Sequence, residues 1–150
     1  MAKVTVKIEG LKELDRALGE LPKSTAKRVL QKVLKDAGEP LAQAARAKAP
    51  REKGFLIENI DVGTKLTRRQ ATLHKKQAKD DRAYAETFVG ASDPAGMQTE
   101  FGNEHQEAEP WLRPAWDAKK DATLEQISNA LWGEIERAAQ RVARKASRRR

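Results

Sequence analysis

Hydrophobic residues near the N-terminus first alternate with polar ones and then recur at helical spacing. The alternation predicts a half-buried strand over residues 4–8, which Gly10 ends. The helical spacing predicts a short amphipathic helix from Leu11 to Glu20, with Pro22 soon after it. The strand pattern is carried by Val4, Val6 and Ile8, and the helical spacing by Leu11, Leu14, Leu18 and, just after the helix, Leu21.

A longer apolar stripe predicts a second helix. It begins near Ser24 or Thr25, either of which can cap a helix N-terminus, and Pro50 ends it. Pro40 lies inside this helix. Because proline lacks an N–H and crowds the carbonyl four residues earlier, we expect a kink or break near Ala37.

In the middle of the chain the hydrophobic period changes to two. Alternation predicts one strand over Ile60–Leu66 and another over Ala83–Val89, and we expect the two to pair as an antiparallel hairpin. Between them, Arg68 to Lys79 contains no acidic residue and little hydrophobicity, which favours a mobile basic hairpin arm at about residues 67–81. The cations of this arm are Arg68, Arg69, Lys75, Lys76 and Lys79.

The last third of the chain predicts turns followed by a long helix. Residues 92–96 have turn composition, and residues 97–102 fit either a short helix or an extended edge. From Trp111 onward apolar residues lie three or four apart, with Pro114 in the first turn and a basic C-terminal end. The sequence thus predicts one α+β domain over residues 1–150, in which a small antiparallel sheet with a β-hairpin packs against two long helices and one short helix.

Composition narrows the function classes. The absence of cysteine excludes disulfides, thiolate zinc sites and cysteine nucleophiles, and no apolar run approaches the ~20 residues of a membrane span. Hydrophobic residues make up 39% and charged residues 35%, so we expect a thin core with some apolar surface completed by neighbours. From the absence of cysteine and of a membrane span we expect synthesis in a reducing cytoplasm and no membrane partner.

Residues that could perform chemistry are few. His74 and His105 have no second histidine or cysteine at metal-ligand spacing, and the glutamates around His105 fit a solvated acidic loop. There is no glycine-rich phosphate loop and no nucleophile elbow. We therefore expect no enzymatic activity, no metal and no cofactor.

The net charge of +8 leaves a small basic DNA-binding protein as the alternative function. The arm cations are candidate contacts to DNA or to an acidic partner, and phosphate contacts would be salt-sensitive. No aromatic residue lies among them for bases to stack on, so a solvated or protein-facing surface is favoured over DNA.

Several short segments of the chain form a specific series when they are taken in order. They are Ile8-Glu9-Gly10-Leu11, Leu14, Leu18, Leu21-Pro22, Ala49-Pro50, Gly54, Leu56, Asn59-Ile60, Glu100-Phe101-Gly102 and Pro110-Trp111-Leu112-Arg113-Pro114-Ala115. Together they resemble the neck or tail-completion (head–tail joining) family of HK97-type siphophages. The match runs from about Val6 to Trp116, and its most specific pieces lie in the second half.

The resemblance implies a small α+β structural protein of the virion, located in the neck at the head–tail junction. Its implied partners are other copies of itself, the tail terminator or tail tube protein on one side, and the head-closure or adaptor protein on the other. The resemblance does not decide whether the protein contacts the genomic DNA that passes through the channel of the neck. The thin core and clustered tryptophans further predict a cyclic homo-oligomer, six- or twelve-fold.

The proline-bounded motif is the candidate interface. Pro110 and Pro114 fix the backbone around Trp111 and Arg113, and tryptophan and arginine are the side chains most enriched in binding hot spots. The alternative is that Trp111 only attaches the C-terminal helix to the core. Glu100 is a candidate partner of Arg113, within one subunit or between two, and the candidate interface residues are Glu100, Phe101, Gly102, Trp111, Leu112 and Arg113.

Overall fold

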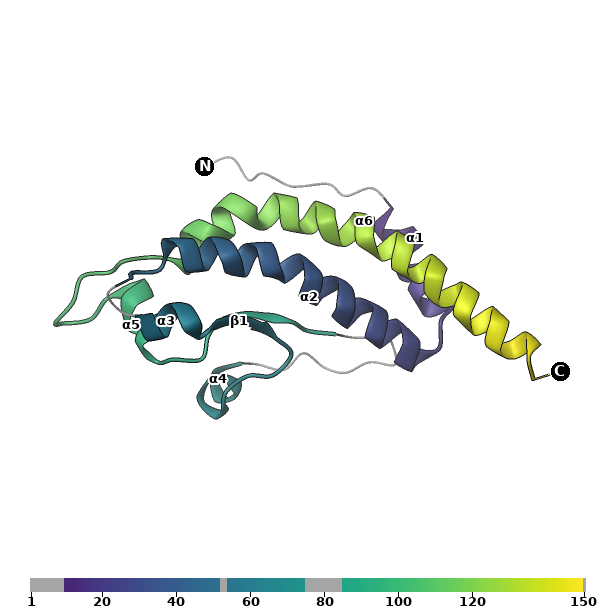
Figure 1. The fold of residues 1–150 in the computed structure, drawn as a ribbon, viewed down its shortest axis with the longest axis horizontal. Coiled ribbons are helices and arrows are strands. Elements are labelled where there is room, and N and C mark those ends of the chain that lie inside the picture. Colours follow the sequence, from purple (N-terminus) through teal and green to yellow (C-terminus); the bar gives the residue numbers. More distant parts are fainter. Residues whose placement is uncertain (1–9, 52–53, 75–84, 150) are drawn as a thin grey trace.

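The computed structural model describes residues 10–51, 54–74 and 85–149. Two long helices lie side by side, and a two-stranded sheet with three short helices lies against one of them (Figure 1). The predicted α+β class is confirmed. The helices are α1 (Leu11–Gly19), α2 (Lys23–Lys48), α3 (Gly54–Glu58), α4 (Arg68–Leu73), α5 (Ala95–Phe101) and α6 (Leu112–Ser147), and the strands are β1 (Ile60–Gly63) and β2 (Phe88–Ala91).

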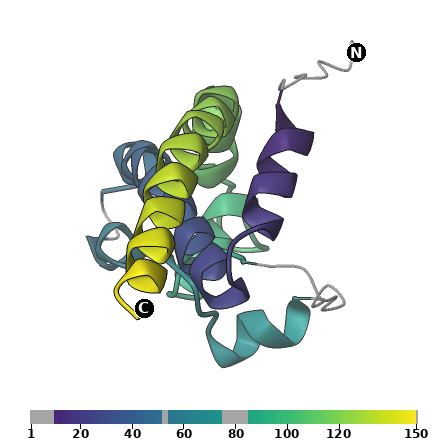
Figure 2. The same cartoon turned by 90° about the vertical axis from the view of Figure 1, so that its right-hand side faces the viewer.

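Helix α2 is central to the fold because both of its sides are covered. One side packs along α6 and, at its N-terminal half, against α1, as the end-on view shows (Figure 2). The other side packs against the sheet, so of the two long helices α2 makes most of the contact with the strands. The hydrophobic core therefore has two clusters of buried residues. The cluster between α1, α2 and α6 contains Leu14, Val29, Val33, Leu131, Ile135 and Ala138. The cluster between α2, the sheet and the start of α6 contains Leu41, Ala42, Ala45, Ala49, Leu56, Ile60, Val62, Trp111 and Ala115.

We expected a kink or a break near Ala37; the break is not present, since α2 is one continuous helix through Pro40. Pro40 is exposed, so its ring faces solvent, and the helix bows gently in Figure 1. Gly38 serves packing: a Cβ there would lie 2.9 Å from Val62 Cγ1 and 3.2 Å from Val89 Cγ2. The missing side chain lets the sheet approach the helix closely.

The two central strands pair antiparallel, as predicted, with Ile60 opposite Ala91 and Val62 opposite Val89. Strand β1 is shorter than the alternation suggested, because Ile60 and Val62 are buried against α2 whereas residues 64 and 65 are exposed. Residues 83 and 84 of the second predicted strand lie outside the described residues. Within the described ones, β2 begins at Phe88 and continues to Ala91, two residues past the predicted end at Val89. The strand expected over residues 4–8 lies outside the described residues.

In each strand of this sheet, one backbone carbonyl oxygen accepts a hydrogen bond from a side chain of a neighbouring helix. Arg46 of α2 donates from Nε and Nη2 to the Ile60 carbonyl oxygen at 3.0 and 2.7 Å. Gln70 of α4 donates from its side-chain amide to the Ala91 carbonyl oxygen at 2.9 Å. The two strands are thereby tied to the neighbouring helices.

The first part of the segment predicted to be a mobile basic arm, Arg68–Leu73, forms helix α4. The reason is a capping box: Thr67 Oγ1 accepts from the Gln70 N–H at 3.3 Å, and Gln70 Oε1 accepts from the Thr67 N–H at 3.0 Å. The His74 ring also packs edge-on to Phe88, with 5.3 Å between ring centres. Lys75, Lys76 and Lys79 lie outside the described residues.

Candidate functional site

The carboxylate of Glu100 caps the N-terminus of α6 from a different helix. Glu100 is the second-last residue of α5 and is only 3% exposed. Its Oε2 accepts from the backbone N–H groups of Trp111 (2.7 Å) and Leu112 (2.8 Å), and its Oε1 accepts from the Arg113 N–H (3.0 Å). Three of the unpaired donors at the helix start are thus satisfied by one acid. Pro114, as expected, lies in this first turn, where its missing N–H costs nothing.

Arg113 completes this arrangement on the surface. Its Nε donates to Glu100 Oε1 at 2.8 Å and its Nη2 donates to the Glu100 carbonyl oxygen at 2.9 Å. The guanidinium also lies over the Phe101 ring, 4.6 Å from the ring centre. The predicted pairing of Glu100 with Arg113 is therefore confirmed within one subunit.

These contacts set the ionisation of Glu100. Burial opposes the charged form, but the hydrogen bonds from Leu112, Arg113 and Trp111 together outweigh it and hold the pKa of Glu100 below its ordinary value. The carboxylate is consequently a fixed negative charge at the positive end of a long helix dipole.

Trp111 belongs to the core in this structure. It is 2% exposed, and its indole Nε1 donates to the Gly96 carbonyl oxygen at 3.1 Å. A Cβ at position 96 would lie 3.3 Å from Trp111 Cζ2 and 3.1 Å from Leu56 Cδ1, so Gly96 makes room for the ring. Of the two roles that the sequence left open, the core role is the one that the described residues show.

Gly102 turns the chain between Glu100 and the acidic loop. Its φ is +73°, and a Cβ there would lie 2.9 Å from the Ala108 backbone nitrogen, so both conformation and space favour glycine. The following turn is closed by a bridge between Asn103 and Gln106. The loop after Gly102 returns to α5, where the Glu109 N–H donates to the Thr99 carbonyl oxygen at 2.8 Å.

A pocket of about 530 Å³ opens beside this arrangement, between α4, β2, α5 and the start of α6. Its lining is mostly apolar, and two large apolar side chains at it are solvent-exposed: Met97 at 52% and Phe101 at 62%. Such side chains in a concave surface are typical of a binding site. The lining residues used below are Arg68, Arg69, Gln70, Met97, Phe101 and Leu112.

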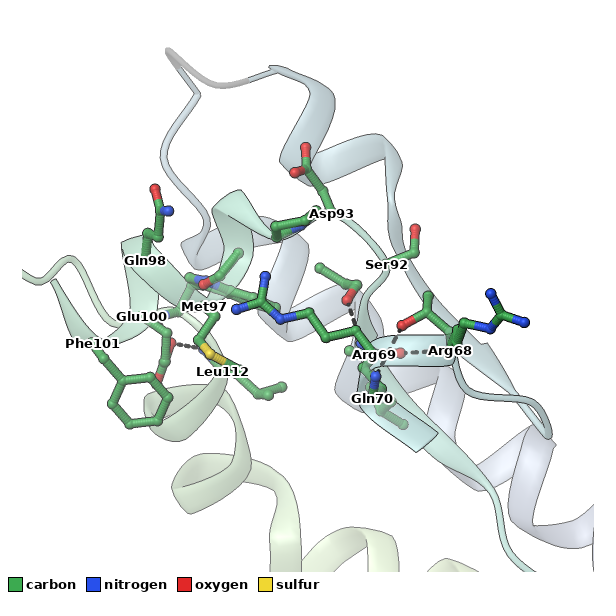
Figure 3. Close-up of a pocket in the computed structure, with 17 residues that line it drawn as sticks. Arg68, Arg69, Gln70, Ser92, Asp93, Met97, Gln98, Glu100, Phe101 and Leu112 are labelled. Atoms are coloured by element: carbon green, nitrogen blue, oxygen red, sulfur yellow. Dashed lines mark hydrogen bonds between the residues drawn. The ribbon is translucent and has the colours of Figure 1, made fainter. Parts of the chain in front are cut away.

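Figure 3 shows how the two arginines of α4 differ. Arg69 extends across the pocket toward α5, whereas the guanidinium of Arg68 points away from Met97 and Phe101. Neither arginine makes a hydrogen bond or ion pair through its side chain with another residue of the described ranges. The pocket thus combines an apolar wall with one available cation.

The structure brings together two sets of residues that the sequence treated separately. Arg68 and Arg69 from the basic segment line the same pocket as Glu100, Phe101, Trp111 and Leu112 from the interface motif, and Gly102 and Arg113 adjoin it. Sequence reasoning missed Met97 and Gln70. No feature of the sequence around Met97 marks it as a site residue. Gln70 could have been found, because Thr67 and Gln70 have the spacing of a helix capping box.

Among residues 10–51, 54–74 and 85–149, no group of three or more potential ligands could hold a metal ion. Within the same ranges, no helix has the length and apolar character that crossing a membrane requires.

Comparison with known families gives a match over more than half of the chain. Residues 12–102 match the HK97-gp10-like family, described as "Bacteriophage HK97-gp10, putative tail-component". The matched range runs from α1 through Glu100-Phe101-Gly102 and ends before α6. Neither the curated proteins nor the solved structures contain a match.

Proposed function

The chain belongs to the HK97-gp10-like family of bacteriophage tail components, and from this premise we propose that it forms a ring at the head–tail junction of a long-tailed phage. In this proposal it is a structural protein of the neck, and it completes the tail or joins the tail to the head. The role requires repeated rigid interfaces and no catalytic group.

The observation that carries the proposal is the pocket between α4 and the α5–α6 junction. Its exposed side chains, Met97 and Phe101, belong to α5. The hydrogen bonds that the Glu100 carboxylate accepts hold α5 against the start of α6. A rigid apolar surface loses little conformational entropy on binding, which favours a specific protein contact. Arg69 adds a charge that can select the orientation of the partner.

The proposed partner at this pocket is a neighbouring copy of the same chain in a six- or twelve-fold ring. A ring of identical subunits is built from heterologous contacts, in which one surface of a subunit meets a different surface of the next. The ring would then meet the tail terminator or tail tube protein on one face and the head-closure or adaptor protein on the other.

The proposal is tested by combining particle imaging with a pocket variant. A virion reconstruction should show ring density for this chain at the neck. The double variant Met97→Ala with Phe101→Ala should fail to enter the ring, because loss of hot-spot side chains commonly costs ~2 kcal/mol or more of binding. Head–tail joining by purified protein provides the quantitative measurement.

Trp132→Ala is the matched control, since Trp132 is exposed on α6 outside the pocket. It should join heads to tails as the parent does. Virions without ring density at the neck, or full joining by the double pocket variant, would refute the proposal.

A further inference from the structure

One end of the α2–α6 pair carries a concentrated positive charge that the proposed ring contact does not use. Residues 23–35 of α2 contain five cations and no acid. Residues 134–149, which form the end of α6 and the two residues after it, contain six cations against Glu134 and Glu136. These two segments lie at the same end of the molecule, because α2 begins where α6 ends (Figure 1).

A groove of about 290 Å³ separates the cations of the two helices. Arg28 and Lys32 line it from α2, and Arg141 and Lys145 line it from α6. On each helix the two cations are four residues apart, and one turn of an α-helix therefore sets them about 6 Å apart along its axis. The groove floor is apolar and is formed by Val29, Ala138 and Val142.

The single acidic residue that lines the groove, Glu134, is already paired with two cations. Its Oε1 accepts from Lys32 Nζ at 2.7 Å and from Arg137 Nη2 at 2.6 Å, and the Lys32 hydrogen bond is the main cause that lowers its pKa. Glu134 thereby fixes one cation from each helix in place.

Three further cations at the groove remain available. Within the described ranges, the side chains of Arg28, Arg141 and Lys145 make no hydrogen bond or ion pair. All three are exposed. A ligand with closely spaced negative charges could therefore reach both walls at once.

The composition of this surface favours nucleic acid over protein. The large exposed apolar side chains of the described residues all lie elsewhere: Phe55, Met97, Phe101, Trp116, Leu124 and Trp132. Protein interfaces have an apolar core with aromatic anchors, whereas DNA interfaces are more polar and much more positively charged. Without an aromatic side chain to stack on bases, the surface suits the backbone of a duplex better than a single strand.

We infer that the groove between the N-terminal half of α2 and the C-terminal half of α6 binds the phosphate backbone of duplex DNA without sequence preference. The contacts are made by Arg28 from one wall and by Arg141 and Lys145 from the other. This site is separate from the pocket beside α4 and does not depend on the ring.

The test measures duplex affinity of the full chain as a function of salt, with two unrelated 30-base-pair duplexes. The parent should bind both equally. Arg28→Ala with Arg141→Ala should weaken binding and lower the magnitude of the slope of log K against log salt by about 1.8, since each lost phosphate contact removes about 0.9.

Lys119→Ala with Lys120→Ala is the matched control, because it removes the same charge from exposed positions in the other half of α6. Its slope should stay close to that of the parent. An equal loss in this control would show that net charge alone binds DNA and would overturn the inference. It would also be overturned by a preference for single strands, or by a groove variant that binds DNA normally but loses contact with a protein partner.

Discussion

The Glu100 carboxylate and Arg113 are joined twice, through the arginine backbone N–H at 3.0 Å and through its side-chain Nε at 2.8 Å. The two residues belong to different helices, so this contact fixes the angle between α5 and the start of α6. The apolar wall of the pocket depends on that angle, since Met97 and Phe101 stand on α5 and Leu112 on α6.

Glu100→Ala should destabilise the fold by about 2–3 kcal/mol, because the first N–H groups of α6 would lose their acceptor. Urea unfolding followed by circular dichroism measures the change. Glu104→Ala, in the exposed acidic loop, should change the free energy of unfolding by less than about 0.5 kcal/mol. Equal stabilities for the two variants would contradict the capping role.

Acid should weaken this contact in a defined direction. The pKa of Glu100 is lower in the folded state than its ordinary value of 4.5, so its stabilising contribution is complete above that value and is lost as pH falls through the folded pKa. The free energy of unfolding should therefore decline below about pH 4.5. In Glu100→Gln this decline should be shallower. The same decline at low pH in the variant and the parent would argue against Glu100 as its cause.

Trp111→Ala should unfold or severely destabilise the isolated subunit, by about 3–5 kcal/mol, because the indole is buried and hydrogen-bonded to Gly96. Phe101→Ala should leave stability nearly unchanged, since that ring is exposed. Thermal unfolding of the two variants separates these roles. A stable Trp111→Ala subunit that fails only in assembly would restore the interface role for this tryptophan.

Gly38→Ala should destabilise the domain by about 1–3 kcal/mol, because the new methyl group would press on Val62 and Val89. Both valines are β-branched and adjust poorly. Gly19→Ala is the control: nothing lies within 4 Å of a Cβ at that position, so stability should be unchanged or slightly higher. Chemical denaturation of both variants tests the difference.

The sequence predicted the short N-terminal helix and the two long helices well because their apolar residues recur at one spacing over several turns. Leu11 to Glu20, the second helix and the C-terminal helix each show helical spacing, and the helices were found within a few residues of the expected bounds. The pairing of the two central strands was also predicted correctly. Strand ends were not, because they depend on where α2 stops covering the sheet.

Several residues that line the pocket were named as candidates from the sequence, whereas Met97, Gln70 and the geometry were not. Glu100 and Arg113 were paired correctly, yet the three backbone N–H groups that the carboxylate also accepts depend on how α5 approaches α6. Burial of Trp111 likewise depends on space left by Gly96. The helix over Arg68–Leu73 was missed because its basic composition was weighed above the Thr67 and Gln70 capping box.

The side chains of Arg46 and Gln70 also influence how copies of this protein can associate. A sheet of two strands has only edges, and exposed edges invite strand-to-strand aggregation between molecules. Here the Ile60 carbonyl oxygen already accepts a hydrogen bond from the Arg46 guanidinium, and the Ala91 carbonyl oxygen already accepts one from the Gln70 side-chain amide. Each edge is obstructed at one acceptor by a long polar side chain, which disfavours fibrous association and leaves copies free to meet through other surfaces.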